Sequence, residues 1–146
     1  RQIWAAVEVM DFGTLAKFFR MLPQKVSHEV SESYGMSAAS FKSWVAVLND
    51  LRNVAAHHNR TWNRQYVWSP KIRKSQLPIE LEHLSNLQNR TYMRIAFLKW
   101  LSSTGHIDSQ TFNDLETHLT TLPNHPLISL QNMGFPNSAT TENVWN

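Results

Sequence analysis

Arginine, asparagine and histidine are concentrated in the segment LRNVAAHHNRTWNR, residues 51–64. In this segment Arg52, Asn53 and His57 could together act on a phosphodiester. Histidine can remove or deliver a proton near neutral pH, and a guanidinium can stabilise negative charge that builds on phosphoryl oxygens. Because Asn53 and His57 are four residues apart on a predicted helix, the amide can hydrogen-bond an imidazole nitrogen and select its tautomer. These groups suit metal-independent RNA cleavage, in which a 2′-hydroxyl attacks its own phosphodiester.

Arg52 and His57 are not natural neighbours on one helix. Five residues turn a helix by about 140° and advance it by about 7.5 Å, so the two side chains point to different sides. A site that uses both needs a second helix or a second subunit. There is also a structural interpretation, because arginine-x4-histidine occurs by chance in many proteins. Histidines near a helix C-terminus interact favourably with the helix dipole.

A basic, aromatic-rich segment follows, in which Trp62, Tyr66 and Trp68 lie among five cations. Aromatic rings can stack on bases while cations hold phosphates, but the same rings can also pack a loop onto the protein body. The sequence leaves both interpretations open. The residues predicted to contact RNA in and after the 51–64 segment are His58, Arg60, Trp62, Asn63, Arg64, Lys71, Arg73 and Lys74.

Other kinds of site have weaker support. The chain has no cysteine and only four glycines, and it lacks the glycine patterns of nucleotide-binding loops and nucleophile elbows. His57 and His58 could bind a transition metal together with His28 or His83, but adjacent histidines face different directions on a helix. The absence of a compact carboxylate cluster also argues against a magnesium site. We therefore predict no metal and no cofactor.

Charge is distributed unevenly along the 146 residues. All 14 Lys and Arg residues lie in 1–99 with seven acidic residues, which leaves +7; residues 100–146 carry four acidic residues, which leaves −4. A polyanionic partner for the first part is plausible, and an ordinary solvated surface is the simpler interpretation. The length suits one domain, no apolar run reaches the roughly 18 residues of a membrane helix, and the lack of cysteine fits a cytoplasmic location.

Apolar spacing predicts an all-α bundle of four to six helices. The clearest helix spans 38–58; Ser37 or Ser40 can cap its start, and Asn59 can end it in the left-handed conformation. Residues 61–78 are predicted to form an irregular loop, and the tail 123–146 to pack on the body through Met133, Phe135 and Trp145. Further helices are predicted over 3–22, with a break or kink at Gly13, and over 24–35, 79–102 and 108–122.

The chain resembles the Abi-like family of bacterial abortive-infection proteins of the AbiD/AbiF type. The segment 51–64 is similar to the family's L-R-N-x-x-A-H-H-x-R-x-W-N-R pattern, and SWVAVLNDLRN is similar to the approach that precedes it. WAAVEVMDFGTLAKFF resembles an N-terminal family segment, and PLISLQNMGFP resembles a C-terminal element. The spacing of Trp145 after MGFP departs from the family pattern, which leaves the role of the tail open.

The resemblance implies a HEPN-like helical domain that spans residues 1–146 and forms the C-terminal part of a longer protein. It implies a metal-independent endoribonuclease that acts in phage defence or as a toxin, with Arg52 and His57 in catalysis and Asn53 in support. The implied partners are RNA, a second copy of the chain, and an antitoxin RNA or protein; no membrane is implied. The alternative is a non-catalytic RNA-binding or protein-interaction module controlled by an antitoxin.

Overall fold

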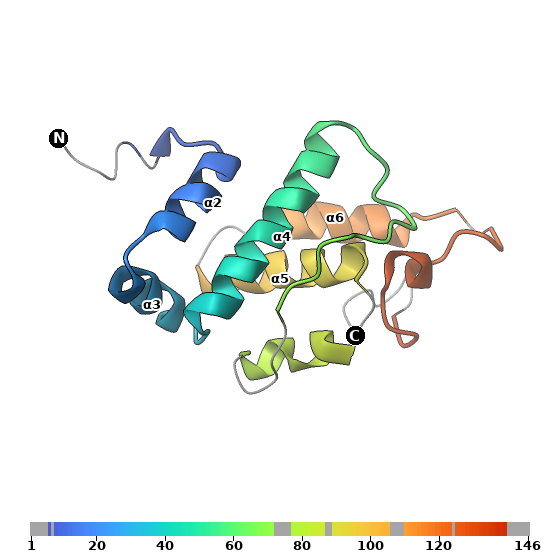
Figure 1. Cartoon of the computed structure of the whole chain (residues 1–146). Helices are drawn as coiled ribbons and strands as arrows, with labels where there is room; N and C mark the ends of the chain where they lie inside the picture. The colour runs from blue at the N-terminus through green and yellow to red at the C-terminus, as the bar shows by residue number, and fades with distance from the viewer. Residues whose placement is uncertain are drawn as a thin grey trace.

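The structure, a computed structural model, confirms the predicted all-α class (Figure 1). It describes residues 6, 8–71, 77–86, 89–105, 110–123 and 125–139. No strand occurs in these ranges, where His125 and Ile128 form only an isolated bridge. The elements are the α-helices α2 (Phe12–Met21), α3 (Gln24–Glu32), α4 (Ala38–Ala56), α5 (Thr91–Thr104) and α6 (Gln110–Thr120), and the 3-10 helices η2 (Ile79–Asn86) and η3 (Leu130–Met133).

The prediction of one helix over 3–22 is wrong, because residues 9–11 are not helical and α2 begins at Phe12. The Asp11 carboxylate starts this helix by accepting hydrogen bonds from the Thr14 backbone N–H at 3.0 Å and from the Thr14 hydroxyl at 2.8 Å. Gly13 therefore lies in the first turn of α2 and does not break it. A Cβ on Gly13 would lie 3.3 Å from the Asn49 Oδ1, so glycine permits a close approach between α2 and α4.

Helix α4 matches the prediction at both ends to within two residues. Its N-cap is Ser37, whose hydroxyl accepts from the Ser40 backbone N–H at 3.2 Å. Trp44 is fully buried, and its ring stacks on Phe97 of α5 with the centroids 4.4 Å apart. The residue that turns the chain after α4 is His58, with φ of 50°, and not Asn59 as the sequence suggested.

The prediction of one helix over 79–102 is also wrong, because the structure divides this segment into η2 and α5. Arg90, the N-cap of α5, is extended. The Thr91 hydroxyl donates to the Thr61 carbonyl at 2.7 Å, and the Asn89 amide donates to the Tyr66 carbonyl at 2.7 Å. These bonds to a segment more than 20 residues earlier favour a break where local spacing alone favours a continuous helix.

The core is built around α4, which contacts α2, α3 and α5 (Figure 1). The buried face of α5 contributes Tyr92, Ile95 and Phe97. Met133 and Phe135 join the same apolar cluster, and the Phe135 ring lies 4.4 Å from that of Tyr92. Trp145, the third apolar residue expected to hold the tail, lies outside the described residues. None of the described helices combines the length and apolarity required to cross a lipid bilayer.

Candidate functional site

Four polar side chains that the sequence singles out are exposed at the C-terminal end of α4. They are Arg52, Asn53, His57 and His58, and we call them the α4 end. Arg52 Nη1 donates to Asn53 Oδ1 at 3.1 Å. The expected hydrogen bond between Asn53 and an imidazole nitrogen of His57 is absent, so the amide holds the guanidinium instead. All four groups are accessible to a large substrate.

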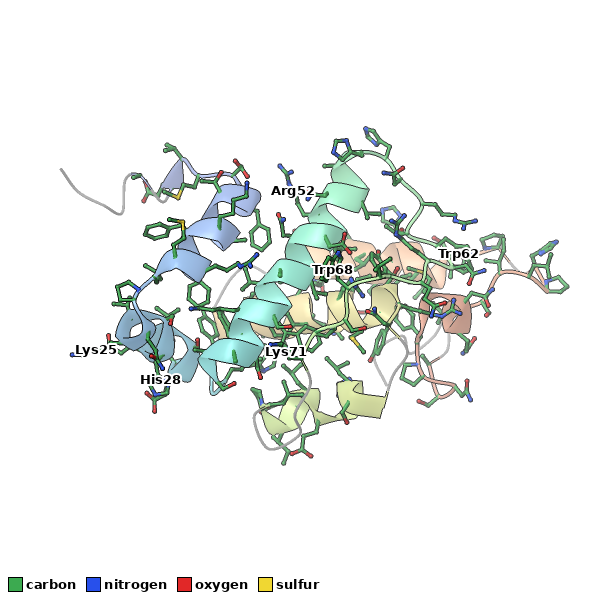
Figure 2. The ribbon with its side chains drawn as sticks, viewed as in Figure 1. Lys25, His28, Arg52, Trp62, Trp68 and Lys71 are labelled. Carbon is green, nitrogen blue, oxygen red and sulfur yellow. The ribbon has the colours of Figure 1, made fainter. Side chains whose placement is uncertain are left out.

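Arg52 lies on the side of α4 that faces α2 (Figure 2). Its charge reaches Asp11, the N-cap of α2. Hydrogen bonds from the Thr14 hydroxyl and the Thr14 backbone lower the pKa of Asp11 most, and the positive charge of Arg52 lowers it further. The guanidinium therefore has an anion near it on one side while it stays open to solvent on the other.

His57 and His58 lie where α4 ends and the chain turns. His57 is the C-cap residue, and its backbone N–H donates to the Asn53 carbonyl at 3.1 Å. His58 takes the left-handed conformation, and Asn59 N–H then donates to the Val54 carbonyl at 2.9 Å. This closure resembles the common left-handed helix ends and explains why the chain leaves the helix here. It places the two imidazoles on a turn and not on a continuing helix face.

The chain after the turn, residues 59–71, is held in place by Arg94 of α5, and we call it the clamped loop. Arg94 has no exposed surface. Its Nη1 donates to Asn89 Oδ1 at 2.7 Å and its Nη2 donates to the Trp68 carbonyl at 2.6 Å. The guanidinium carbon lies 3.6 Å from the centroid of the Tyr66 ring, and Nη2 lies 3.9 Å from the Asp50 carboxylate. One buried cation thus connects α4, α5 and the loop.

Burial lowers the pKa of Arg94 to about 10, and the Tyr66 and Asp50 side chains partly offset that effect. The guanidinium therefore remains charged at neutral pH. Its Nε has no hydrogen-bond partner. The sequence analysis did not identify this residue, although a cation within the apolar run TYMRIAFLKWL was a usable signal. A charge that is buried in this way must be paired to be tolerated.

The three aromatic residues of the clamped loop have different surroundings. Tyr66 is buried beneath Arg94, and Trp62 is half-buried against the core cluster. Trp68 is 72% exposed, and the neighbouring Val67 is 92% exposed. The two interpretations left open by the sequence therefore apply to different rings: Tyr66 and Trp62 pack the loop onto the body, whereas Trp68 faces solvent.

The cations and polar residues predicted to contact RNA divide in the same way. Arg60 and Lys71 are exposed, whereas Arg64 is half-buried with its guanidinium carbon 5.3 Å from the Tyr66 ring centroid. Asn63 Oδ1 accepts a hydrogen bond from Arg90 Nη1 at 2.6 Å, so this acceptor already has a structural partner. Arg73 and Lys74 lie outside the described residues.

Within the described ranges, no three His, Asp or Glu side chains come together as metal ligands would. His28 lies on α3, where its Nε2 is 3.8 Å from the Glu32 carboxylate, and His83 lies on η2. Figure 2 shows His28 at the opposite end of the molecule from the C-terminal end of α4. The alternative of a histidine metal site with His57 and His58 therefore has no support from the geometry.

The comparison with protein families identifies the segment that carries α2, α3, α4 and the turn. Residues 2–63 match the family model described as Abi-like protein. The matched range includes the whole α4 end and stops at Asn63, so the basic residues from Arg64 to Lys74 and the MGFP element lie beyond it. No curated protein and no solved structure matches the chain at a significant level.

Proposed function

We propose that the chain is a metal-independent endoribonuclease. Its residues 2–63 match the family model described as Abi-like protein, and the name of that family denotes abortive infection, which supports a role in phage defence. The α4 end is the proposed active site. Cleavage of RNA in the infected cell would stop growth and so limit the phage. The HEPN superfamily assignment belongs to this proposal, and it rests on the arginine-x4-histidine spacing of Arg52 and His57.

The observation that carries the proposal is the exposure of Arg52 and His57 on a helix whose remainder is firmly packed. Surface arginine and histidine side chains are common, but these two lie at the C-terminal end of α4, the helix that contacts α2, α3 and α5. Asn53 holds the Arg52 guanidinium at 3.1 Å, which reduces the entropy that the side chain would lose on binding phosphate. The segment between Asp50 and Glu80 also contains six cations and no acid, which favours a polyanionic substrate.

The chemistry requires one proton to be removed and one to be delivered. The bond from the 2′-oxygen to phosphorus forms, and the bond from phosphorus to the 5′-oxygen breaks. A neutral imidazole of His57 accepts the 2′-hydroxyl proton, and a protonated imidazole donates a proton to the leaving 5′-oxygen. Arg52 stabilises the charge on the non-bridging oxygens. The products are a 2′,3′-cyclic phosphate and a free 5′-hydroxyl.

Two protonation states of histidine in one reaction favour a dimer. Arg52 faces α2, whereas His57 is the C-cap residue and lies on the turn that follows α4. A two-fold axis near the α4 end would bring a second Arg52 and a second His57 to the same cleft, as expected of an isologous contact. In this arrangement one subunit supplies the base and its partner supplies the acid.

The test is cleavage of labelled single-stranded RNA in excess EDTA, followed by mass analysis of the fragment ends. We expect cyclic phosphate ends with the unmodified protein and none with Arg52→Ala or His57→Ala. Arg20→Ala on α2 and His118→Ala on α6 are matched controls, because both residues are exposed and distant in sequence from α4. Equal cleavage by all variants would contradict the site. RNA that is bound and left intact would instead support the alternative of a non-catalytic module controlled by an antitoxin.

A further inference from the structure

The Trp68 side chain is exposed, although hydrogen bonds from two other residues hold its backbone in place. Its carbonyl accepts two hydrogen bonds, from Arg94 Nη2 at 2.6 Å and from Asn89 Nδ2 at 3.1 Å. Three residues later, the Lys71 N–H donates to the Ser43 hydroxyl on α4 at 2.7 Å, and the intervening Pro70 is buried. The indole is therefore presented to solvent on a fixed loop. Binding through it would require little further ordering of the chain.

The same buried cation relates Trp68 to His57. Arg94 Nη2 contacts both the Trp68 carbonyl and, at 3.9 Å, the Asp50 carboxylate. Asp50 lies on α4 about two turns before His57, the C-cap residue of the helix, which corresponds to about 10 Å along the helix axis. The Trp68 backbone therefore lies beside the last two turns of α4, which lead to His57. Figure 2 shows Arg52 on the opposite side of α4, toward α2.

The clamped loop, which carries Trp68, is basic. It contains three cations, Arg60, Arg64 and Lys71, and no acidic residue, which favours an anionic occupant. Among them, Arg60 and Lys71 are exposed and flank Trp68 in sequence on either side. An unpaired stretch of RNA combines phosphates with the faces of bases, and aromatic rings stack on such bases with little dependence on sequence.

We propose that Trp68 is a stacking platform for an unpaired nucleobase of the RNA strand whose phosphodiester reaches His57. This inference rests on the proposed ribonuclease function and names the part of the substrate that is held away from the cut. Val67, the residue before Trp68, is 92% exposed and is likewise accessible to a ligand. The loop residues Tyr66 and Trp62 do not take part, because their rings already contact the protein body.

The test measures RNA affinity in a His57→Ala background, so that the RNA stays intact. The probe is fluorescein-labelled single-stranded oligouridylate of about 12 nucleotides, a length within the usual site sizes of single-strand binders. Trp68→Ala should raise Kd about 5- to 150-fold, the range expected for loss of one stacked base. Trp68→Phe should give an intermediate Kd. Leu127→Ala is the matched control, because Leu127 is 75% exposed in the tail and should leave Kd unchanged.

Salt dependence separates stacking from charge. Trp68→Ala should leave the slope of log Kd against log salt unchanged, because an indole releases no counterion. Lys71→Gln should flatten that slope by about 0.7 if this side chain contacts a phosphate of the single strand. An abasic ribose-phosphate oligomer should bind the Trp68→Ala variant and its parent equally. Circular dichroism and urea unfolding should be the same for both, because the removed side chain is exposed.

The outcomes distinguish failure of the platform from failure of the proposed function. If the unmodified protein cleaves RNA in EDTA and Trp68→Ala alters neither Kd nor cleavage, the platform is wrong and the ribonuclease proposal stands. If the protein binds RNA without cutting it, the ribonuclease proposal fails. The stacking role of Trp68 is then tested by Kd alone, and a Kd that Trp68→Ala leaves unchanged would overturn it. If no RNA is bound, both proposals fail. Loss of self-association with an unchanged Kd would show that Trp68 contacts protein and would overturn the platform.

Discussion

The α4 end and the clamped loop are adjacent in sequence, yet they differ in how many hydrogen bonds join them to distant parts of the chain. Arg52, His57 and His58 are exposed, and the one hydrogen bond between side chains in this group joins Arg52 to its neighbour Asn53. In the clamped loop, backbone carbonyls and an amide oxygen accept hydrogen bonds from side chains of the segment 89–94. Residues of one sequence motif thus differ in their surroundings, because some are exposed at the end of α4 whereas others hold the loop in place, and their types alone do not reveal which is which.

The first prediction concerns the α4 end and has the largest expected effect. Arg52→Ala and His57→Ala should each reduce RNA cleavage by about 10²- to 10⁴-fold, the usual contribution of a positioned acid, base or charge donor. If two His57 side chains share one cleft, His57→Ala subunits should also inactivate unmodified partners, because a mixed dimer keeps only one of the two imidazoles that the reaction needs. Activity is measured as initial rate against the mixing ratio.

The same variants also test whether the side chains of the α4 end contribute to the stability of the fold. The free energies of unfolding of both variants, from urea unfolding, should stay within about 0.5 kcal/mol of that of the unmodified protein, as is usual for exposed sites. Activity that falls only in proportion to the fraction of unmodified protein, at concentrations where the protein is shown to be dimeric, would contradict the shared cleft. A large loss of stability in either variant would show that the α4 end resembles the clamped loop more than we infer.

The second prediction concerns the cation that holds the loop. Arg94→Ala should destabilise the protein by about 3–5 kcal/mol, because it leaves the Asp50 carboxylate and the Trp68 carbonyl without their shared partner. Arg94→Lys should fall between, since lysine keeps the charge but cannot make the same forked contacts. Arg60→Ala is the matched control, because Arg60 is exposed on the same loop. Urea unfolding measures the stability of each variant. Equal midpoints for Arg94→Ala and Arg60→Ala would show that Arg94 does not stabilise the loop.

The difference between the two regions also explains which features of the structure could be predicted from the sequence. Helix α4, its Ser37 cap and the exposed Arg52 and His57 follow from local spacing and capping rules, which depend on neighbours along the chain. The break before α5 does not follow from them, because it depends on hydrogen bonds from Asn89 and Thr91 to residues 66 and 61. No periodicity within 79–102 carries that information.

Site prediction was limited by the same distance in sequence. Asn63 was expected to contact RNA because it belongs to the motif, but its amide oxygen accepts from Arg90, 27 residues later. Arg94 was overlooked because its partners, Asp50 and Trp68, are remote in sequence. The side chain of Asn53 was expected to hydrogen-bond His57, but its amide oxygen accepts from the neighbouring Arg52 instead. Residue types identify the chemistry, whereas tertiary contacts decide which groups remain available for it.

The third prediction tests the structural role of Asn63. Asn63→Ala should destabilise the protein by about 1–2 kcal/mol, because it removes a hydrogen bond to the Arg90 guanidinium and places alanine at φ of 48°. Asn63→Gly removes the bond without the backbone strain and should cost less. Asn59→Ala is the exposed control. If Asn63→Gly weakens RNA binding and leaves the urea midpoint unchanged, Asn63 belongs with the α4 end and not with the clamped loop.

The last prediction concerns Asp11, where the α4 end meets α2, and its effect is the smallest. The pKa of Asp11 is lowered from 3.8, chiefly by the Thr14 hydroxyl and also by the charge of Arg52. A carboxyl with a lowered folded-state pKa contributes stability that is present above its unfolded pKa and is lost as pH falls through the folded value. Asp11→Ala should therefore lower the urea midpoint at neutral pH and have little effect well below 3.8.

Asp11→Asn separates the cap from the charge, because asparagine can still accept the Thr14 N–H bond at any pH. Its stability should depend less on pH than that of the unmodified protein between neutral pH and 3 or so. Carboxyl titration by NMR then ranks the two causes of the lowered pKa. Thr14→Val should raise the pKa of Asp11 more than Arg52→Ala does, since the hydrogen bond is the larger cause. The opposite order would mean that Arg52 is bound to Asp11 as firmly as the loop is bound to Arg94, and the α4 end would no longer be the loosely held region.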